Sequence, residues 1–185
     1  MTTALTVGKY QNEPDACADL NRRLTACKLW IVMDEVWGEQ VHPRLDTEAK
    51  STDATQHKGV IIDRLLLPTR EIVKAGWIEG AIGIEAKKSG LPMGRRVCQA
   101  MDYTRCVFRT HEYFNHVMLK WVFLWPAQWP TGDLASVMAN YRVGTVAPFS
   151  HNGLVFTVNS THVIVADSDR VSVKLPTCGH KVGSR

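Results

Sequence analysis

The sequence of 185 residues lacks several features that would assign it to a special class of protein. Its five cysteines form no CxxC pair and are odd in number, which argues against a disulfide framework and against a zinc ribbon. The apolar stretch 118–127 is much shorter than the roughly 20 residues of a membrane span and contains Lys120. The first residues lack the charged and apolar regions of a signal peptide. These absences predict a soluble cytoplasmic protein with free, buried thiols and no membrane partner.

The composition predicts one compact domain over residues 1–185. Hydrophobic residues make up 45% of the chain and charged residues 22%, which allows a substantial core and excludes disorder and collagen-like structure. No internal repeat is present. Hydrophobic periodicity indicates helices at 14–28, 95–113 and 132–141, and strands at 29–36, 60–67, 81–87, 117–125, 143–147, 154–158 and 162–166. This order predicts an α/β fold around a central mixed β-sheet flanked by helices, and the polar stretch 42–58 is expected to be a surface loop or hairpin end.

The positive charge is concentrated in one segment. The chain has 22 Lys and Arg against 18 Asp and Glu, a formal charge of +4. Between Lys87 and Arg109 there are six basic residues and one acid, so this segment carries the whole excess. A solvated helix face is one interpretation; a binding surface for a polyanion such as DNA is the other. The residues expected to contact phosphates are Lys88, Arg95, Arg96, Arg105 and Arg109.

Two predicted strands carry acids in apolar surroundings. In strand 81–87 the alternation of side chains places Ile82, Ile84 and Ala86 on one face and Glu85 with Lys87 on the other. The preceding strand, VIIDRLLL, contains a single acid, Asp63. A carboxylate within an apolar run is costly to desolvate unless it is paired or binds a cation. If the strands are neighbours, the two carboxylates suit Mg²⁺ or Mn²⁺, and Lys87 can orient a water or stabilise charge on a phosphodiester.

Three segments resemble the PD-(D/E)xK nuclease superfamily, most closely its RecB-type branch. They are GVIIDRLLLP (59–68), IGIEAKK (82–88) and QAMDY (99–103), which follow the order of the GxxD, (D/E)xK and QxxxY motifs of that branch. The resemblance covers residues 13–125 and leaves 126–185 as a C-terminal extension that packs on or extends the core. It implies a restriction-endonuclease-like core and a Mg²⁺- or Mn²⁺-dependent deoxyribonuclease.

The resemblance also implies a role for individual residues. Asp63 and Glu85 match the metal-binding acids, and Lys87 matches the catalytic lysine. Gln99 and Tyr103, four apart on one helix face, match the pair that supports the site and contacts nucleic acid nearby.

The sequence departs from the family pattern in three places. Ile62 replaces the proline that precedes the metal-binding aspartate in the name-giving motif. The long interval between the first and second acids predicts an extended hairpin tip around 69–79. The family's helical acid has three candidates, of which Glu13, at the start of the first predicted helix, is preferred; Glu35 and Glu39 are the alternatives.

These observations favour a DNA endonuclease over an exonuclease, because the chain has no motor motif. GLPMGRR lacks the GxxxxGK[ST] order of a nucleotide-binding P-loop. The alternatives are a catalytically inactive nuclease-fold module that binds nucleic acid or a protein partner, and a hydrolase of another phosphodiester. A homo-oligomer or a larger DNA-processing assembly, in a bacterial or phage-infected cell, fits a short nuclease of this kind.

Overall fold

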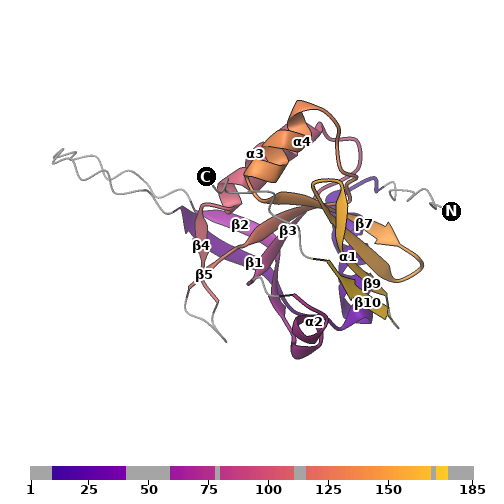
Figure 1. Ribbon diagram of the computed structural model, residues 1–185. Helices are drawn as coiled ribbons and strands as arrows, with labels where there is room; N and C mark the ends of the chain where they lie inside the picture. The colour runs from indigo at the N-terminus through magenta and orange to yellow at the C-terminus, as the bar shows by residue number, and fades with distance from the viewer. Residues whose placement is uncertain (1–9, 41–58, 78–79, 111–115, 168–169, 175–185) are drawn as a thin grey trace, which may run out of the picture.

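The computed structural model describes residues 10–40, 59–77, 80–110, 116–167 and 170–174. Within these residues ten strands form one open, mixed sheet, and four helices pack against it (Figure 1). The helices are α1 (Glu13–Cys27), α2 (Arg70–Lys74), α3 (Met93–Tyr103) and α4 (Asp133–Asn140). The strands are β1 (Trp30–Gln40), β2 (Val60–Pro68), β3 (Ile82–Ala86), β4 (Cys106–Phe108), β5 (Val117–Met118), β6 (Trp121–Trp125), β7 (Val143–Phe149), β8 (Gly153–Val158), β9 (Thr161–Asp167) and β10 (Arg170–Val173).

The sheet combines parallel and antiparallel pairings. Its strand order is β10-β9-β8-β7-β6-β3-β2-β1-β4-β5. Strand β6 is parallel to β3 and to β7, and the other described neighbours are antiparallel. All five residues of β3 are buried, as expected for a central strand covered on both faces. The predicted α/β class with a mixed sheet is therefore confirmed.

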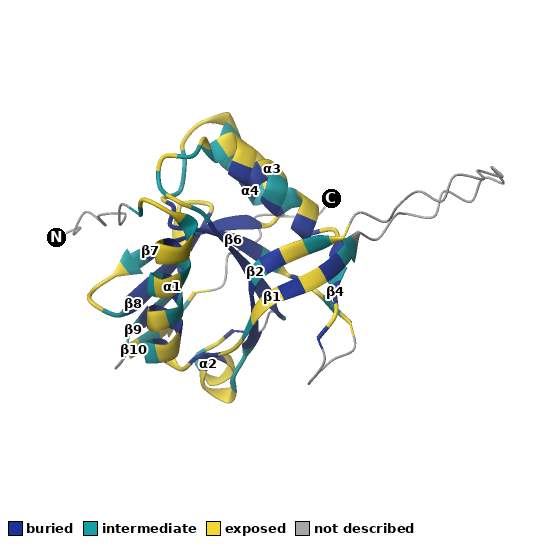
Figure 2. Cartoon of the chain, turned by 180° about the vertical axis from the view of Figure 1, so that it is seen from behind, coloured by how far each residue is buried: buried dark blue, intermediate teal, exposed yellow. Residues whose placement is uncertain are grey.

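Two cores lie on opposite faces of the sheet. Helix α1 covers one face, where Leu20 packs in the same core as Ile82, Ile84 and Ala86. Helices α3 and α4 cover the other face, around a core that includes Val97. Figure 2 shows α1 on the β7–β10 side of the molecule and α3 with α4 above the sheet. The predicted apolar face of β3 is confirmed, whereas its other face is also buried, under α3.

Local signals explain where α1 begins. Asn12 caps the helix, because its side-chain oxygen accepts a hydrogen bond from the Asp15 backbone nitrogen at 2.8 Å. Pro14 occupies the first turn, where its missing N–H is not needed. Just before the cap, Tyr10 and Ser89 exchange two hydrogen bonds of 2.9 and 3.1 Å. This contact fixes the first turn of α1 against the loop that follows β3.

The described part of the C-terminal extension continues the same sheet. Strand β7 pairs with β6, and β8, β9 and β10 follow as antiparallel neighbours. Arg23 of α1 ties this region to the helix, since its Nη1 donates to the Gly153 carbonyl at 2.8 Å. Helix α4 packs beside β7. The described strands of this region thus extend the sheet, and α4 packs on one face of it.

The structure corrects three predictions of secondary structure. The strand expected at 117–125 is two strands, because residues 119–120 separate β5, which pairs with β4 at the sheet edge, from β6, which pairs with β3 at its centre. The helix expected at 95–113 ends at Tyr103, and Cys106–Phe108 forms β4, which pairs with β1. Phe108 is fully buried over Gly38, where a Cβ would lie 2.7 Å from the ring, so the glycine leaves the room that the phenyl group occupies. The hairpin tip expected at 69–79 contains the short helix α2 in its described part. The stretch 42–58 lies outside the described residues.

The predictions about membrane spans and about cysteine pairing can be compared with the structure only within the described residues. No helix there is long and apolar enough to cross a membrane. The four described cysteines, Cys17, Cys27, Cys98 and Cys106, are free thiols; Cys27 and Cys106 are buried, as predicted, whereas Cys17 is half-buried and Cys98 is exposed. Cys178 lies outside the described residues.

Candidate active site

The strands that carry Asp63 and Glu85 are neighbours, and they separate beside these residues. The antiparallel pairing of β2 with β3 runs from Leu66–Ile82 to Arg64–Ile84 and stops there. In the next position the Asp63 Oδ2 atom accepts a hydrogen bond from the Ala86 backbone nitrogen at 2.7 Å. The Asp63 side chain, rather than a backbone carbonyl of β2, is thus the acceptor for Ala86 at the end of the β2–β3 pairing. This hydrogen bond fixes the Asp63 carboxylate next to β3.

Glu85 is the more buried acid of the pair. Its side chain is 1% exposed, and its Oε1 atom accepts a hydrogen bond from Lys87 Nζ at 2.7 Å. Its other oxygen, Oε2, is buried and makes no hydrogen bond. The Tyr103 hydroxyl, which donates to the Ile61 carbonyl at 2.9 Å, is near enough to Glu85 to act on its pKa as a hydrogen-bonding group. A buried carboxylate oxygen without a partner is costly, and a bound cation is one way to remove that cost.

Lys87 connects β3 to helix α1. Its Nζ atom lies 3.0 Å from Glu13 Oε1 as well as 2.7 Å from Glu85 Oε1. The first turn of α1 therefore places Glu13 at the site, 74 residues away along the chain. The alternative acids lie elsewhere on β1: Glu39 pairs with Arg109, and Glu35 is exposed with a left-handed backbone (φ 47°). Of the three candidates for the helical acid, Glu13 contacts Lys87.

Burial and repulsion between the two carboxylates shift the pKa values of the acids. Burial and the nearby Asp63 charge raise the pKa of Glu85 to about 7. Burial also raises the pKa of Asp63, against the opposing effect of its hydrogen bond from Ala86. For Lys87, burial lowers the pKa, but the hydrogen bonds to Glu85 and Glu13 outweigh burial and raise it overall. The carboxylates are therefore disfavoured in the ionised state, and a cation at this site would relieve the cost.

Gln99 and Tyr103 form a layer under the site rather than an exposed surface. The Gln99 Nε2 atom donates to the Tyr103 hydroxyl at 2.7 Å, as their spacing on one helix face allows. Tyr103 is 3% exposed, and burial raises the pKa of its hydroxyl. The hydroxyl links α3 to β2 through the Ile61 carbonyl. Tyr103 thus holds α3 over β2, and the prediction that it contacts nucleic acid does not fit its burial.

A cavity of about 270 Å³ adjoins the acids. Lys87, Arg95, Arg96, Gln99 and Leu91 line it, so its polar lining consists of three cations and an amide. Such a lining suits a phosphate group. Arg95 is exposed at the first turn of α3, which makes it available to an anion in the cavity.

Arg96 departs from the prediction that it contacts phosphate. It is 6% exposed, and its Nη1 and Nη2 atoms donate to the carbonyls of Pro126 and Trp125 at 3.1 and 2.8 Å. The guanidinium therefore ties α3 to the end of β6. Its orientation follows from long-range packing, which the charge pattern of the segment does not reveal.

We expect the neighbouring arginines to respond differently to the same substitution. Arg96→Met removes two hydrogen bonds to buried carbonyls and should lower the free energy of unfolding by about 2–4 kcal/mol. Arg95→Met should change it by less than about 0.5 kcal/mol, because the side chain is exposed. Chemical denaturation of both variants measures the difference. Equal stability of the two proteins would contradict the structural role of Arg96.

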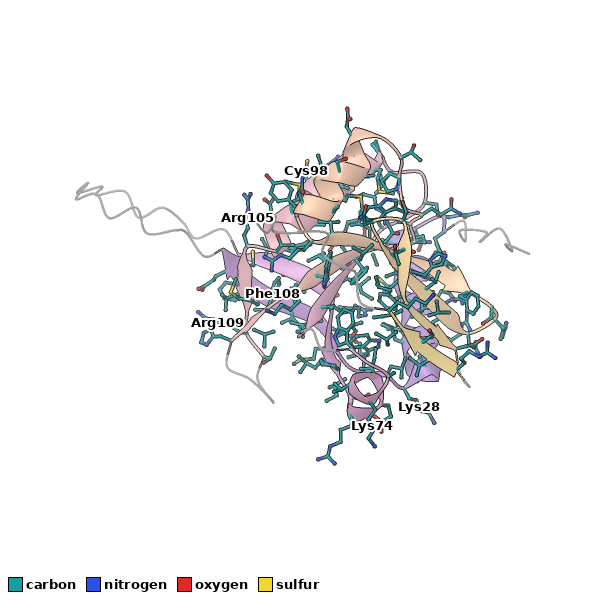
Figure 3. All side chains as sticks on the ribbon, viewed as in Figure 1. Lys28, Lys74, Cys98, Arg105, Phe108 and Arg109 are labelled. Atoms are coloured by element: carbon teal, nitrogen blue, oxygen red, sulfur yellow. The ribbon has the colours of Figure 1, made fainter. Side chains whose placement is uncertain are left out.

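The remaining cations predicted to contact DNA are dispersed. Arg105 and Arg109 flank β4 and point outward, whereas Phe108 between them points into the molecule (Figure 3). Arg105 lies over the Tyr141 ring at 5.5 Å, and Arg109 pairs with Glu39 at 2.9 Å. Lys88 is exposed next to the site. The basic segment thus forms several small surfaces rather than one continuous patch.

Arg64 is a positioning residue that the sequence motifs do not single out. Its Nε atom lies 2.6 Å from Asn21 Oδ1 of α1 and 2.9 Å from Asp34 Oδ1 of β1. Its Nη1 atom donates to the Asp63 carbonyl. Arg64 therefore holds α1, β1 and β2 together directly beside Asp63. An arginine within an apolar strand, immediately after the single acid of that strand, is the sequence signal that could have identified it.

The donor set at the site is compatible with a hard divalent cation but is not assembled around one. Asp63, Glu85 and Glu13 supply only oxygen atoms, which suit Mg²⁺ or Mn²⁺. Among the described residues, no three acid, His or Cys side chains are grouped closely enough to hold a metal ion. Lys87 instead occupies the position between Glu85 and Glu13.

Comparisons of the chain with protein-family models, curated proteins and solved structures find no match.

Proposed function

We propose that the protein is a metal-dependent DNA nuclease, more specifically an endonuclease, with a restriction-endonuclease-like core. The observation that supports this most strongly is the meeting of Asp63, Glu85, Lys87 and Glu13 from three separate segments of the chain. These are the residues that the resemblance to PD-(D/E)xK nucleases selects. Their adjacency does not depend on that resemblance, since it follows from the pairing of β2 with β3 and from the contact of α1 with the loop after β3.

The oxygen donors present suit Mg²⁺ or Mn²⁺ once Lys87 leaves its position between Glu85 and Glu13. Asp63 and Glu85 would hold the ion, with Glu13 as a third ligand once Lys87 turns from it towards substrate. The unpartnered Oε2 atom of Glu85 supports this assignment, because an oxygen ligand with no other partner is free for a cation. When bound, the ion would polarise the phosphodiester and lower the pKa of a water ligand.

The chain's own residues would bind and orient the substrate. The ammonium group of Lys87 would donate hydrogen bonds to a non-bridging phosphate oxygen or to the attacking water, in place of its present contact with Glu13. Arg95, at the mouth of the cationic cavity, would hold a neighbouring phosphate. Gln99 and Tyr103 would keep α3 over the strand that carries Asp63. Together these contacts place the scissile phosphate between the acids and the basic lining.

Removal of divalent metal is expected to abolish activity. Purified protein incubated with supercoiled plasmid should produce nicked and linear DNA in Mg²⁺ or Mn²⁺ and none in excess EDTA, because the acids alone repel the phosphate. Agarose gel electrophoresis resolves the three forms of plasmid. Cleavage that continues at the same rate in EDTA would contradict a metal-dependent mechanism.

A second candidate function is a nuclease-fold module that binds nucleic acid without cutting it. One observation favours it: in the described part of the chain, Lys87 lies between the acids and no three-ligand group is formed. This module would bind DNA with strong salt dependence and would show no cleavage in any divalent metal. The plasmid assay and a salt titration of DNA binding therefore separate the two candidates.

A further inference from the structure

An exposed apolar surface lies beside the candidate active site and has no role in the proposed chemistry. We name it the Trp37 face; it consists of Val32, Trp37 and Ile61, which are 36%, 37% and 56% exposed. Trp37 and Ile61 are direct partners in the pairing of β1 with β2. Their neighbours Val36 and Ile62 are buried in the core on the α3 side. Trp37 and Ile61 therefore point to the opposite face of the sheet, which α1 covers only farther along.

The Trp37 face adjoins Asp63. Ile61 precedes Asp63 by two residues on β2, a separation of roughly 7 Å along a strand. Strict alternation of side chains breaks at Asp63, because Ile62 packs in the α3-side core whereas Arg64, two residues on, contacts Asn21 of α1. Asp63 therefore lies where β2 changes face, and a nucleic-acid strand with a phosphate there would have its neighbouring nucleotide within reach of Ile61 and Trp37.

The Trp37 ring borders an open pocket of about 590 Å³. The Arg109 guanidinium lies over the ring, 4.9 Å from its centroid, and is held there by its ion pair with Glu39. This cation–π contact orients the indole and leaves 37% of Trp37 exposed. The ring is therefore a fixed aromatic surface beside a space large enough for a ligand group.

The charges around this pocket disfavour a phosphate. Asp34 pairs with Arg64, and Glu39 pairs with Arg109, so these four charges are balanced. Glu35, which also lines the pocket, is exposed and acidic. A polar anion is better placed in the cationic cavity on the α3 side, whereas a neutral, flat group suits the Trp37 face.

We propose that the Trp37 face binds an unpaired base of the DNA strand whose phosphate lies at Asp63 and Lys87. This inference rests on the proposed nuclease function and specifies its substrate class as DNA with unpaired nucleotides, such as single strands, overhangs or flaps. Bases within a duplex are stacked on their neighbours and do not present a free ring. Stacking on an aromatic side chain is tolerant of sequence, so no base preference is expected.

The test compares Trp37 with a matched aromatic residue away from the site. Tyr141 is also 37% exposed and also has an arginine, Arg105, over its ring. Trp37→Leu, Trp37→Phe and Tyr141→Ala are prepared, and thermal unfolding verifies that each variant is folded. Fluorescence anisotropy then measures binding of a labelled single strand and of its duplex, in EDTA at low ionic strength so that no cleavage occurs.

Trp37→Leu should weaken binding of the single strand by about tenfold and leave duplex binding unchanged. Trp37→Phe should retain most of the affinity, because the aromatic surface remains, and Tyr141→Ala should match the wild type on both ligands. Equal affinity of wild type and Trp37→Leu for the single strand, an equal loss on both ligands, or no binding of single strands by the wild type would each overturn the inference. The last result would leave a protein partner as the occupant.

The outcome separates this inference from the nuclease proposal. Single-strand binding that depends on Trp37 in a protein with no cleavage activity would support the base site and overturn the nuclease function. If the protein cleaves DNA with metal but its Trp37→Leu variant binds single strands as tightly as the wild type, the nuclease function is supported and the base site is overturned.

Discussion

Replacement of Lys87 by methionine is expected to lower the rate of Mg²⁺-dependent DNA cleavage by about a hundred- to a thousandfold. Lys87 is the cation at the centre of the candidate site, with Nζ 2.7 Å from Glu85 and 3.0 Å from Glu13. Methionine has a similar length and keeps the apolar part of the side chain, so the loss reports on the ammonium group. Initial rates of plasmid nicking at saturating Mg²⁺ measure the effect.

Lys88→Met provides the matched control. It removes the same charge from the adjacent residue, which is exposed and takes no part in the ion pairs that Lys87 makes with Glu85 and Glu13. We expect this variant to keep its cleavage rate within about threefold of the wild type, with any loss confined to DNA affinity and relieved at low salt. If Lys87→Met and Lys88→Met lose the same amount of activity, Lys87 contributes only general positive charge, and its assigned role is wrong.

Replacement of Glu85 by glutamine is expected to stabilise the metal-free protein at alkaline pH. Burial and the Asp63 charge raise the pKa of Glu85 to about 7 in the folded state, above its ordinary value of 4.5. The stability that Glu85 contributes in its protonated form is complete below about pH 4.5 and is lost as the pH rises through 7. Glutamine cannot ionise, so the variant should avoid a loss of about 3 kcal/mol.

Thermal unfolding in EDTA at about pH 5 and about pH 8 measures this effect. The Glu85→Gln variant should melt about 5–10 °C above the wild type at the higher pH and much closer to it at the lower pH. Glu39→Gln is the control, because this acid lies at the surface in an ion pair with Arg109 and should change stability by less than about 1 kcal/mol. A Glu85→Gln protein that is less stable than the wild type at about pH 8 would show that the Glu85 carboxylate is stabilised by its ion pair with Lys87.

Addition of Mg²⁺ should reverse the order of stability. A ligand that binds only the folded protein raises its melting temperature, and the wild type retains the carboxylate that would hold the ion. The Glu85→Gln variant should gain little from the metal. On this proposal the buried, unpartnered oxygen of Glu85 lowers the stability of the metal-free protein and is a ligand for the ion when metal is added.

Local sequence patterns predict the elements that carry the site but not all of their limits. The strands with Asp63 and Glu85 and the helix that begins at Glu13 follow from apolar periodicity, a Pro at the first turn and flanking turn residues. The helix expected to continue to residue 113 stops at Tyr103, because Phe108 packs over Gly38 of β1. That contact joins segments 70 residues apart, and no local pattern contains it.

In the candidate site too, local patterns predict some features, whereas others depend on contacts between distant segments. The acids and Lys87 could be selected from sequence, because a charge within an apolar strand is costly without a partner. The burial of Arg96, the hydrogen bond from Ala86 to Asp63 and the contact of Lys87 with Glu13 depend on how α3, β3 and α1 meet. The same limit applies to Trp37, whose exposure follows from which part of the sheet α1 leaves uncovered.

Binding of Mn²⁺ tests the central claim most directly. Electron paramagnetic resonance of free Mn²⁺ is measured during titration with wild-type protein and with Asp63→Asn and Glu85→Gln. A metal-dependent nuclease centred on these acids should remove free Mn²⁺ from solution in the wild type and bind it at least about tenfold more weakly in each variant. Equal binding by all three proteins, or no binding by the wild type, would contradict a metal site between β2 and β3.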